Sequence, residues 1–320
     1  MDAVPSKKLR RLYRGLVVLS CLLIVGWCAF AAVRYFHLDY HLKCAFNRCE
    51  TGQVSQPKHG PRLDDRLGLT LNHLYFETYA KPLVGVNQNL SGLTYMPEYD
   101  QLVAVVNRPG TLLVLQTDGE VLRRHPLTGV SDTEGVAYLG DGRVVVLQEK
   151  KRTIAVLTLP ERDGEGIIAD KAQMYPLPMA KQRNSGPEGI GYDAQTDTLY
   201  VVKEKAPTGL YSIQGIGRGT PIVHRDLSHL LAATGFATDL SSVEFDPVGR
   251  RLLLLSDEAQ ALFTLSLEGE LLQSRSLWPS VGGGFALPMP QPEGVAIGAN
   301  NHVYVVSEPN LFSVLAPEAR

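Results

Sequence analysis

Five similar units follow one another along most of the chain, and this repetition limits the fold more than any other feature. Each unit opens with Ser or Glu and a small residue. It continues with a short apolar strand, a turn, a second strand rich in Val, Leu and Tyr, a polar residue and a third strand. The units begin at positions 91, 134, 188, 241 and 293, which places their starts 43 to 54 residues apart. Repeats of this kind and spacing are typical of the four-stranded blades of a β-propeller.

The number of blades follows from how the ring closes. Only 28 residues run from Glu293 to the C-terminus, which is enough for three strands but hardly for four. The segment "NHLYFETYAKPL" (72–83) supplies a further strand before the first unit. Pairing the two chain ends in one blade removes exposed sheet edges. We therefore predict an all-β fold, a propeller of five blades. Six blades is the alternative, if residues 216–238 form a degenerate blade instead of a helix-bearing insertion.

The N-terminal segment does not belong to the propeller. Residues 15–33, "GLVVLSCLLIVGWCAFAAV", are uncharged and apolar, and about 20 such residues span a bilayer. Five Lys and Arg residues precede this run, so the positive-inside rule places residues 1–14 in the cytoplasm. We predict a cytoplasmic basic segment (1–14), a transmembrane anchor (15–33), a stalk (34–70) and a propeller domain (71–320). The competing interpretation is a signal peptide that is cleaved near "AFA" (29–31).

Both interpretations export the remainder of the chain. Residues 1–34 hold 6 of the 31 basic and 1 of the 33 acidic residues, which leaves 25 basic against 32 acidic residues outside. An acidic domain of this kind is a poor binder of nucleic acid and a suitable binder of cations. Cys44 and Cys49, in "CAFNRC", follow the apolar run in an oxidising compartment, where we expect a local disulfide. No suitably spaced Cys or His pair accompanies them to make a zinc site.

Polar residues recur at two fixed positions of the repeat. The first set opens the first strand and comprises Ser91, Glu134, Glu188, Ser241 and Glu293. The second set follows the second strand and comprises Asn107, Glu149, Glu204, Asp257 and Glu308. If Asp141-Gly142 is a two-residue turn, Glu134 and Glu149 lie opposite each other at the open end of the hairpin. The same register applied to the other units predicts five facing pairs at one mouth of the propeller channel.

Like charges that face each other destabilise a fold unless they are compensated. Ca²⁺ takes six to eight oxygen ligands, and Glu134, Glu188 and Glu293 offer several, with Ser91, Ser241 and water completing the shell. Mg²⁺ is less suited to an all-protein site. Arg108, Lys150 and Lys203 flank the second set, and we expect these residues, together with the second set, to contact a ligand. The simpler alternative is a ring of solvated, turn-facing residues without a function.

The repeat also carries a family resemblance. The segments that bear it are "NLSGLTYMPEYDQLVAVVNRPG", "TEGVAYLGDGRVVVLQEKK", "GPEGIGY…LYVVKEK", "DLSSVEF…LLLLSDEAQAL" and "QPEGVAIGANNHVYVVSEPN". Together they resemble the SdiA-regulated, YjiK-like family of bacterial envelope proteins over about residues 70–317. The resemblance implies a β-propeller on the outer side of the inner membrane, and it implies no particular reaction.

Two classes of function remain open. The first is a binding module, anchored in the bacterial inner membrane, whose periplasmic propeller holds Ca²⁺ and recognises an envelope ligand or protein. The second is a metal-dependent hydrolase, of the lactonase, esterase or phosphoesterase kind, in which Glu149 or Glu204 acts as the base. The sequence favours binding, because it contains no G-x-S-x-G, H-E-x-x-H or P-loop motif.

Overall fold

The computed structural model of the chain describes residues 7–35, 68–169, 172–179, 186–205, 207–235, 237–279 and 287–318. The chain divides into two units, Met1–Arg48 and Cys49–Arg320, and each is treated by itself. Cys44 and Cys49 lie outside the described residues, so their disulfide remains a prediction.

The N-terminal unit contains one helix, α1 (Lys7–Tyr35), which includes the apolar run predicted from the sequence. Large apolar side chains of this helix are exposed, among them Leu22, Leu23 and Trp27. Within the described part of the chain, no helix meets the combined length and hydropathy of a membrane span.

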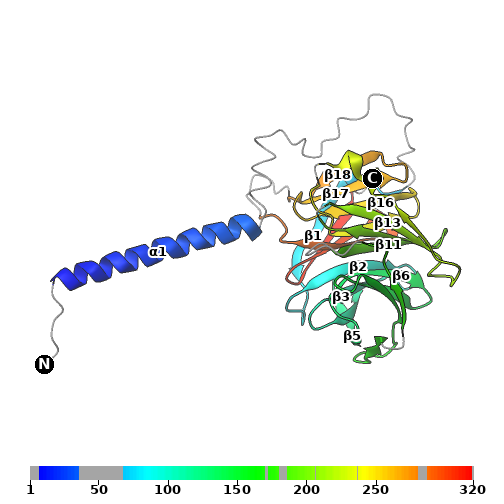
Figure 1. Ribbon diagram of the computed structural model, residues 1–320, viewed down its shortest axis with the longest axis horizontal. Helices are drawn as coiled ribbons and strands as arrows, with labels where there is room; N and C mark the ends of the chain where they lie inside the picture. The colour runs from blue at the N-terminus through cyan, green and yellow to red at the C-terminus, as the bar shows by residue number, and fades with distance from the viewer. Residues whose placement is uncertain are drawn as a thin grey trace. The chain divides into compact units, whose positions relative to one another are not determined.

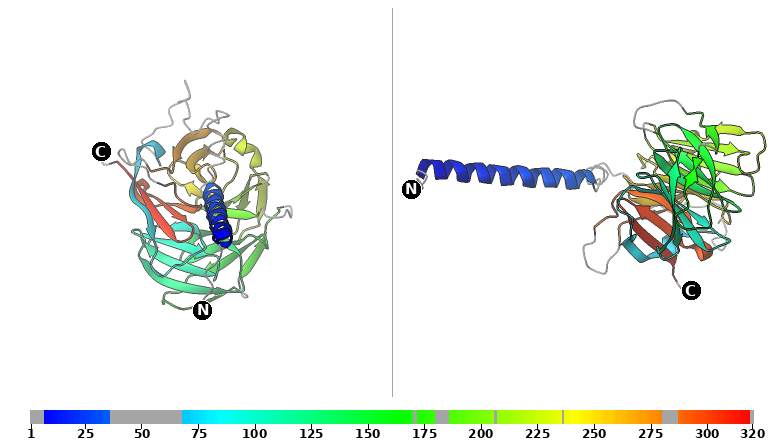
Figure 2. Two further views of the ribbon diagram at one scale, coloured as in Figure 1. Left: turned by 90° about the vertical axis from the view of Figure 1, so that its left-hand side faces the viewer. Right: turned by 90° about the horizontal axis from the view of Figure 1, so that it is seen from below.

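The second unit is a five-bladed β-propeller, as the repeat predicts, and its sheets are arranged around a common centre (Figures 1 and 2). Blade 1 contains β2 (Leu90–Met96), β3 (Gln101–Val106), β4 (Thr111–Gln116), β5 (Val121–Thr128) and the short β9 (Ile167–Ile168). Blade 2 contains β6 (Thr133–Gly140), β7 (Arg143–Gln148), β8 (Thr153–Thr158) and β10 (Gln173–Pro176). Blade 3 contains β11 (Pro187–Asp193), β12 (Thr198–Lys203), β13 (Gly209–Gln214) and β14 (Val223–Asp226).

Blade 4 contains β15 (Ser242–Asp246), β16 (Arg251–Ser256), β17 (Ala261–Ser266) and β18 (Leu271–Ser276). Blade 5 joins the two ends of the propeller: β19 (Pro292–Ile297), β20 (Val303–Ser307) and β21 (Leu311–Pro317) are completed by β1 (Leu74–Pro82). The pairing of β1 with β21 is antiparallel, and it confirms the closure predicted from "NHLYFETYAKPL". In Figure 2 the cyan N-terminal strand lies beside the red C-terminal strands.

The region around residues 216–238 does not form a sixth blade. It supplies β14, the outer strand of blade 3, and then the 3₁₀ helix η3 (Ser228–Thr234). The prediction of a helix-bearing insertion is therefore correct in part, but it missed the strand. Leu231 of η3 is buried against blades 3 and 4, in a cluster that includes Phe245 and Phe263.

The innermost strands β2, β6, β11, β15 and β19 contact one another in that cyclic order. Their close approach depends on residues without a side chain. A Cβ atom on Gly135 would lie 2.8 Å from the Glu188 carbonyl oxygen, and one on Gly294 would lie 2.5 Å from that of Ser91. Blade 4 has Ser242 at this position, and its hydroxyl accepts a hydrogen bond from the Val295 amide at 3.2 Å.

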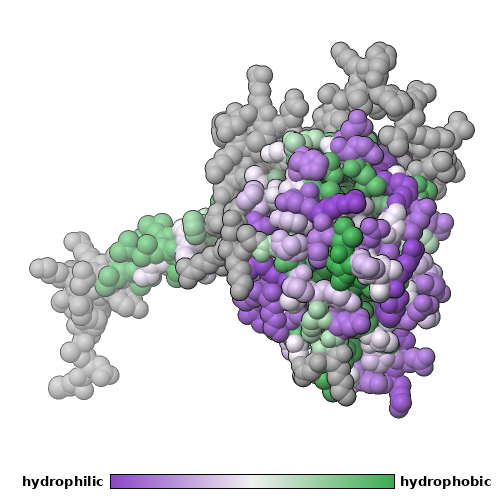
Figure 3. Space-filling model, turned by 45° about the vertical axis from the view of Figure 1, so that its right-hand side comes forward, coloured by the Kyte–Doolittle hydropathy of each residue, from purple (hydrophilic) through white to green (hydrophobic). Residues whose placement is uncertain are grey.

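The hydrophobic core consists of five clusters, one between each pair of neighbouring blades. The alternation of the strands explains this, because successive side chains point to opposite faces of a blade and so toward two different neighbours. The face of the propeller shown in Figure 3 is mostly hydrophilic, with its hydrophobic side chains gathered in a band.

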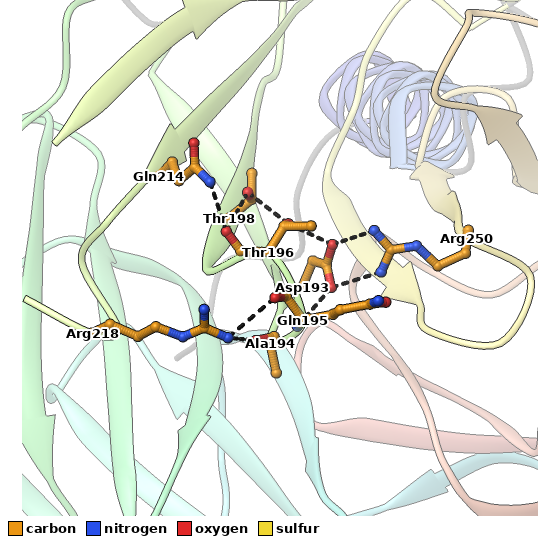
Figure 4. Close-up of polar contacts among 8 residues, drawn as sticks. All are labelled: Asp193, Ala194, Gln195, Thr196, Thr198, Gln214, Arg218 and Arg250. Carbon is orange, nitrogen blue, oxygen red and sulfur yellow. Dashed lines mark hydrogen bonds and ion pairs between the residues drawn. The ribbon is translucent and has the colours of Figure 1, made fainter. Parts of the chain in front are cut away.

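An ion pair ties blade 3 to blade 4 at the end of the inner strands where the first turn lies (Figure 4). Arg250 donates to both carboxylate oxygens of Asp193, at 2.8 and 2.7 Å, and its guanidinium lies 4.7 Å from the centre of the Phe245 ring. Asp193 is 1% exposed. Burial acts to raise the pKa of Asp193, but the hydrogen bonds from Arg250, Thr196 and the Gln195 amide, together with the Arg250 charge, lower that pKa overall.

We predict that Arg250→Met lowers the free energy of unfolding by about 2 kcal/mol, because it leaves the buried Asp193 carboxylate without its charge partner. Arg250→Lys keeps the positive charge but loses the bidentate contact, so its free energy of unfolding is expected to lie between those of Arg250→Met and the wild type. Urea denaturation at pH 7 measures the difference. An unchanged stability of Arg250→Met would show that the contact is only a surface pair.

A second prediction concerns Glu244, a buried carboxyl in the middle of β15. Burial raises the pKa of Glu244 to about 8. Between the ordinary carboxyl pKa and that value the folded protein holds a proton that the unfolded chain has lost, so stability falls as the pH rises through this window. In the wild type we expect the free energy of unfolding to fall by about 2–4 kcal/mol between pH 5 and pH 8 because of this group, and we expect Glu244→Gln to remove that fall. Identical pH slopes of the two proteins in urea denaturation would contradict it.

Candidate functional site

The first set of polar residues lies where the inner strands begin, at one mouth of the propeller. In four blades the ladder between the first and second strands shifts register there: between Leu90 and Leu93, Thr133 and Val136, Pro187 and Gly189, and Pro292 and Gly294. In blade 4, the Ser241 amide donates to the Leu255 carbonyl, although Leu255 already pairs with Ser242. A β-bulge of this kind frees one residue from the ladder and redirects its side chain. Ser91, Glu134, Glu188, Ser241 and Glu293 occupy these positions.

The bulges overturn the prediction that the two polar sets face each other directly. Thr133 is paired with Gln148, and the Glu149 amide donates to the Asp132 carbonyl at 2.9 Å. Glu149 therefore lies opposite Asp132, two residues before Glu134. Glu308 likewise donates to the Gln291 carbonyl and not to the residue predicted, Glu293. The sequence register was wrong because each bulge inserts an extra residue that a simple turn does not reveal.

The other blades show the same offset. Asn107 donates to the Asn89 carbonyl and Glu204 to the Gly186 carbonyl. In blade 4 the Asp257 amide binds the Asp239 carboxylate at 3.0 Å. A third set of positions, two residues before the first set, thus completes the mouth; it comprises Asn89, Asp132, Gly186, Asp239 and Gln291.

Glu134 connects blade 2 to blade 1 at the mouth. Its carboxylate accepts hydrogen bonds from the Ser91 hydroxyl at 2.9 Å and from the Asn107 amide at 2.5 Å. Carboxylate oxygens of Asp132, Glu134 and Glu149 all lie within 4.8 Å of one another. Glu134 of the first set therefore meets two members of the second set. Asn107 of blade 1 donates a hydrogen bond to it, and Glu149 lies near it in the group that includes Asp132.

Glu149 reaches across from blade 2 toward blade 3. A Cβ atom on Gly186 would lie 2.1 Å from the Cγ atom of Glu149, so this glycine leaves the space that the Glu149 side chain occupies. Burial raises the pKa of Glu149, and the neighbouring Asp132 carboxylate raises it further.

The remaining first-set carboxyls are held near other carboxyls. Burial raises the pKa of Glu134 to about 7, with Asp132, Glu149 and Glu308 adding to the rise and the Ser91 hydrogen bond opposing it. The pKa values of Glu188 and Glu293 are raised well above the ordinary value, again by burial first and then by neighbouring carboxylates. Glu188 and Glu293 are not part of the close trio, among the residues that the structure describes.

The two serines of the first set have different surroundings. Ser91 faces Glu134, whereas the Ser241 hydroxyl donates to the Pro292 carbonyl at 2.7 Å, which links blade 4 to blade 5. Burial raises the pKa of Glu308, and Arg108 opposes the rise.

Two of the three cations predicted at the rim lie beside the same carboxylate, that of Asp132. The Lys150 ammonium lies 2.6 Å from Asp132 Oδ1, and the Arg108 guanidinium lies 3.9 Å from the same atom. Burial acts to raise the pKa of Asp132, but hydrogen bonding to Lys150 and Glu149, together with the Lys150 charge, lowers that pKa overall. Lys203 is buried and donates to the carbonyls of Lys205 and Pro207.

Sequence reasoning missed Asp132 and Asp239. Both are buried: Asp132 is 8% exposed, and Asp239 is 1% exposed and accepts hydrogen bonds from Ser256 and from the amides of Asp257 and Glu258. The signal was present, because four of the five units carry Asn, Asp or Gln two residues before the first set. We missed these positions because the assumed hairpin register paired the second set with the first set and not with the residues two positions earlier.

Oxygen ligands of one cation can lie up to about 5 Å apart, since each is 2.3–2.6 Å from Ca²⁺. The trio of Asp132, Glu134 and Glu149 satisfies this limit, and the Ser91 hydroxyl and Asn107 amide lie beside it. All of these atoms are hard oxygen donors, which suit Ca²⁺ better than zinc or copper.

The chain is distantly similar to several solved structures. A luciferin-regenerating enzyme is 13% identical, with 75% of this chain and 96% of that chain covered and a TM-score of 0.47. A gluconolactonase from Xanthomonas campestris is 14% identical, with 78% and 94% covered and a TM-score of 0.46. A chain of a nidogen/laminin complex is 11% identical, with 69% and 73% covered and a TM-score of 0.45. Similarity this distant carries no argument about activity.

Residues 67–316 match the family model of the SdiA-regulated proteins, which covers almost the whole propeller and agrees with the resemblance of the five repeat units. The chain belongs to the SdiA-regulated family.

Proposed function

We propose that this protein is a cation-dependent binding module of the bacterial envelope. Its propeller mouth binds Ca²⁺ among carboxylates, and the bound cation presents open coordination positions to an envelope ligand or protein. Residues 15–33 anchor the chain in the inner membrane, with residues 1–14 in the cytoplasm and the propeller in the periplasm.

One observation carries the cation part of the proposal: carboxyl groups from blades 2, 3 and 5 crowd one mouth and raise one another's pKa. Beyond the effect of burial, the Glu134 carboxylate raises the pKa of both Glu188 and Glu293, and the pKa of Glu134 is itself raised by Asp132, Glu149 and Glu308. Carboxylates gathered in this way stay ionised at low energetic cost only beside a positive charge. A divalent cation supplies that charge and uses the oxygens that the bulges direct to the mouth.

The ligand part rests on the rim. A cation held on one side of an open mouth keeps ligand positions that water or a ligand oxygen can fill. Exposed Lys150 and Arg108 stand beside the cluster, and their side chains are 71% and 72% exposed. A ligand with carboxylate or phosphate oxygens can bind the cation and these two residues together. The bound cation and these two basic residues would thus allow an anionic ligand to bind at a mouth whose carboxylates alone would repel it.

The membrane anchor is supported by composition and by helix α1. The run 15–33 has no charged residue, and the described part of the helix exposes apolar side chains on all sides. A helix that is apolar all round needs an apolar environment.

We predict that Ca²⁺ raises the melting temperature of the full chain, purified in detergent, by about 5–10 °C at a concentration 100 times Kd. Glu134→Gln is expected to remove most of this shift, because it takes away a charged ligand that lies within the trio. Glu120→Gln is the matched control: this carboxyl is exposed, in the turn between β4 and β5. Metal analysis of the purified protein accompanies the titration.

Absence of bound metal together with no thermal shift would contradict the cation proposal. The same preparation is assayed on lactones, esters and phosphoesters. Turnover that is lost with a chelator and with Glu188→Gln would show that the protein is a hydrolase and that binding alone is an incomplete account.

The anchor is tested by fractionation of cells that express the chain with a C-terminal tag. We expect the full chain to stay with the inner membrane after an alkaline carbonate wash, and a chain lacking residues 1–34 to be absent from it. Release of the full chain by the wash contradicts the anchor. A mature N-terminus near residue 32, found by mass spectrometry, would indicate cleavage of a signal peptide instead.

A further inference from the structure

The mouth contains one small group of residues that is prepared for a cation. We call it the Asp132 pocket and define it by Asp132, Glu134, Glu149 and Asn107. Blade 2 supplies the three carboxylates, and Asn107, which follows β3, supplies the amide from blade 1. The carboxylate oxygens approach within 4.8 Å of one another, which is the span of a Ca²⁺ coordination sphere.

Two buried acceptors in this pocket have no hydrogen-bond donor among the residues that the structure describes. Asp132 is 8% exposed, and its Oδ2 atom makes no hydrogen bond. Asn107 is 9% exposed, and its Oδ1 atom is equally without a partner. The Asn107 Nδ2 atom donates to Glu134 Oε1, so the amide group is held against the carboxylates. Buried acceptors are normally satisfied in folded proteins, and a carboxylate oxygen and an amide oxygen without donors at one place are suitable ligands for a cation.

Lys150 is positioned to act in place of that cation. Its ammonium group contacts Asp132 Oδ1 at 2.6 Å, while the other oxygen of Asp132 stays unpartnered. The lysine side chain is 71% exposed, so nothing packs it into this position and it can turn into solvent. A single ammonium carries one charge and neutralises only part of a three-carboxylate cluster.

We infer that Lys150 is an internal competitor of the cation: it binds Asp132 in the metal-free protein and leaves when Ca²⁺ enters the pocket. This inference rests on the proposed function, and it adds how the affinity of that site is set. The lysine lowers the cost of keeping Asp132 ionised without metal, and by the same contact it weakens metal binding. Loss of the contact makes the carboxylate fully available to the cation.

The test is calorimetric titration of Ca²⁺ into the full chain in detergent at constant ionic strength. We expect Lys150→Met to lower the Kd for Ca²⁺ about three- to tenfold, the range expected for loss of one partly buried ion pair. Lys150→Arg keeps the charge and should remain close to the wild type. Circular dichroism in the presence of a chelator verifies that each variant is folded.

Lys151→Met is the matched control. Lys151 is the adjacent residue, it is exposed, and its ammonium contacts the Gly129 carbonyl at 3.4 Å and no carboxylate in the part of the chain that the structure describes. The two methionine variants change the net charge equally, so a general electrostatic effect would appear in both. We expect Lys151→Met to change Kd less than about twofold, since exposed charges are screened by salt.

The outcomes separate the two proposals. Tighter binding in Lys150→Met alone supports the competition. Equal affinities of Lys150→Met and Lys151→Met, or weaker binding in Lys150→Met, overturn the role of Lys150 while wild-type binding leaves the cation site in place. If neither the wild type nor Lys150→Met binds Ca²⁺, the proposed cation function fails, and the competition fails with it.

Discussion

The propeller depends on how closely its five inner strands approach one another around the axis. At Gly92, Gly135, Gly189 and Gly294 the next blade's backbone takes the space that a side chain would need. This contact sets the distance between blades, because the side chains farther out must fill whatever gap the inner strands leave. The five core clusters are therefore consequences of the contact at the axis, since each of them packs between two blades whose separation is already fixed.

The close approach of the inner strands at these glycines also creates the polar mouth. In four blades the residue before the small residue lies at a register shift of the ladder, and its side chain is free to project toward the axis. In three blades that residue is Glu, so close packing at the axis delivers carboxyl groups to one small region. The close packing of the inner strands and the crowding of carboxyl groups therefore have the same structural origin. A repeat with a small residue at the start of each inner strand provides five neighbouring positions for functional side chains.

The sequence was sufficient for the blade count and the closure, because both follow from repeat spacing and from "NHLYFETYAKPL", which became β1 beside β21. It was insufficient for the register at the mouth. The turn at Asp141-Gly142 does pair Gly140 with Arg143, as assumed, but the ladder slips on the way to Glu134. A bulge has no distinct sequence signature here, because Glu-Gly at the start of a strand is also compatible with regular pairing. Asp132 was missed for this reason, although it stands two residues from Glu134.

The placement of a cation on the blade 1 and 2 side of the mouth follows from how charge is already balanced elsewhere. Between blades 3 and 4, the Lys205 ammonium lies 2.8 Å from a Glu204 oxygen and 3.1 Å from a Glu258 oxygen, so one partly buried lysine serves two carboxylates. At blade 2 the compensation is uneven: Lys150 and Arg108 both lie beside Asp132, while Glu134 receives neutral donors from Ser91 and Asn107. Neutral donors orient a carboxylate but do not cancel its charge. The mouth is therefore electrostatically uneven, and a divalent cation gains most where oxygens are closest together and least neutralised by the protein itself.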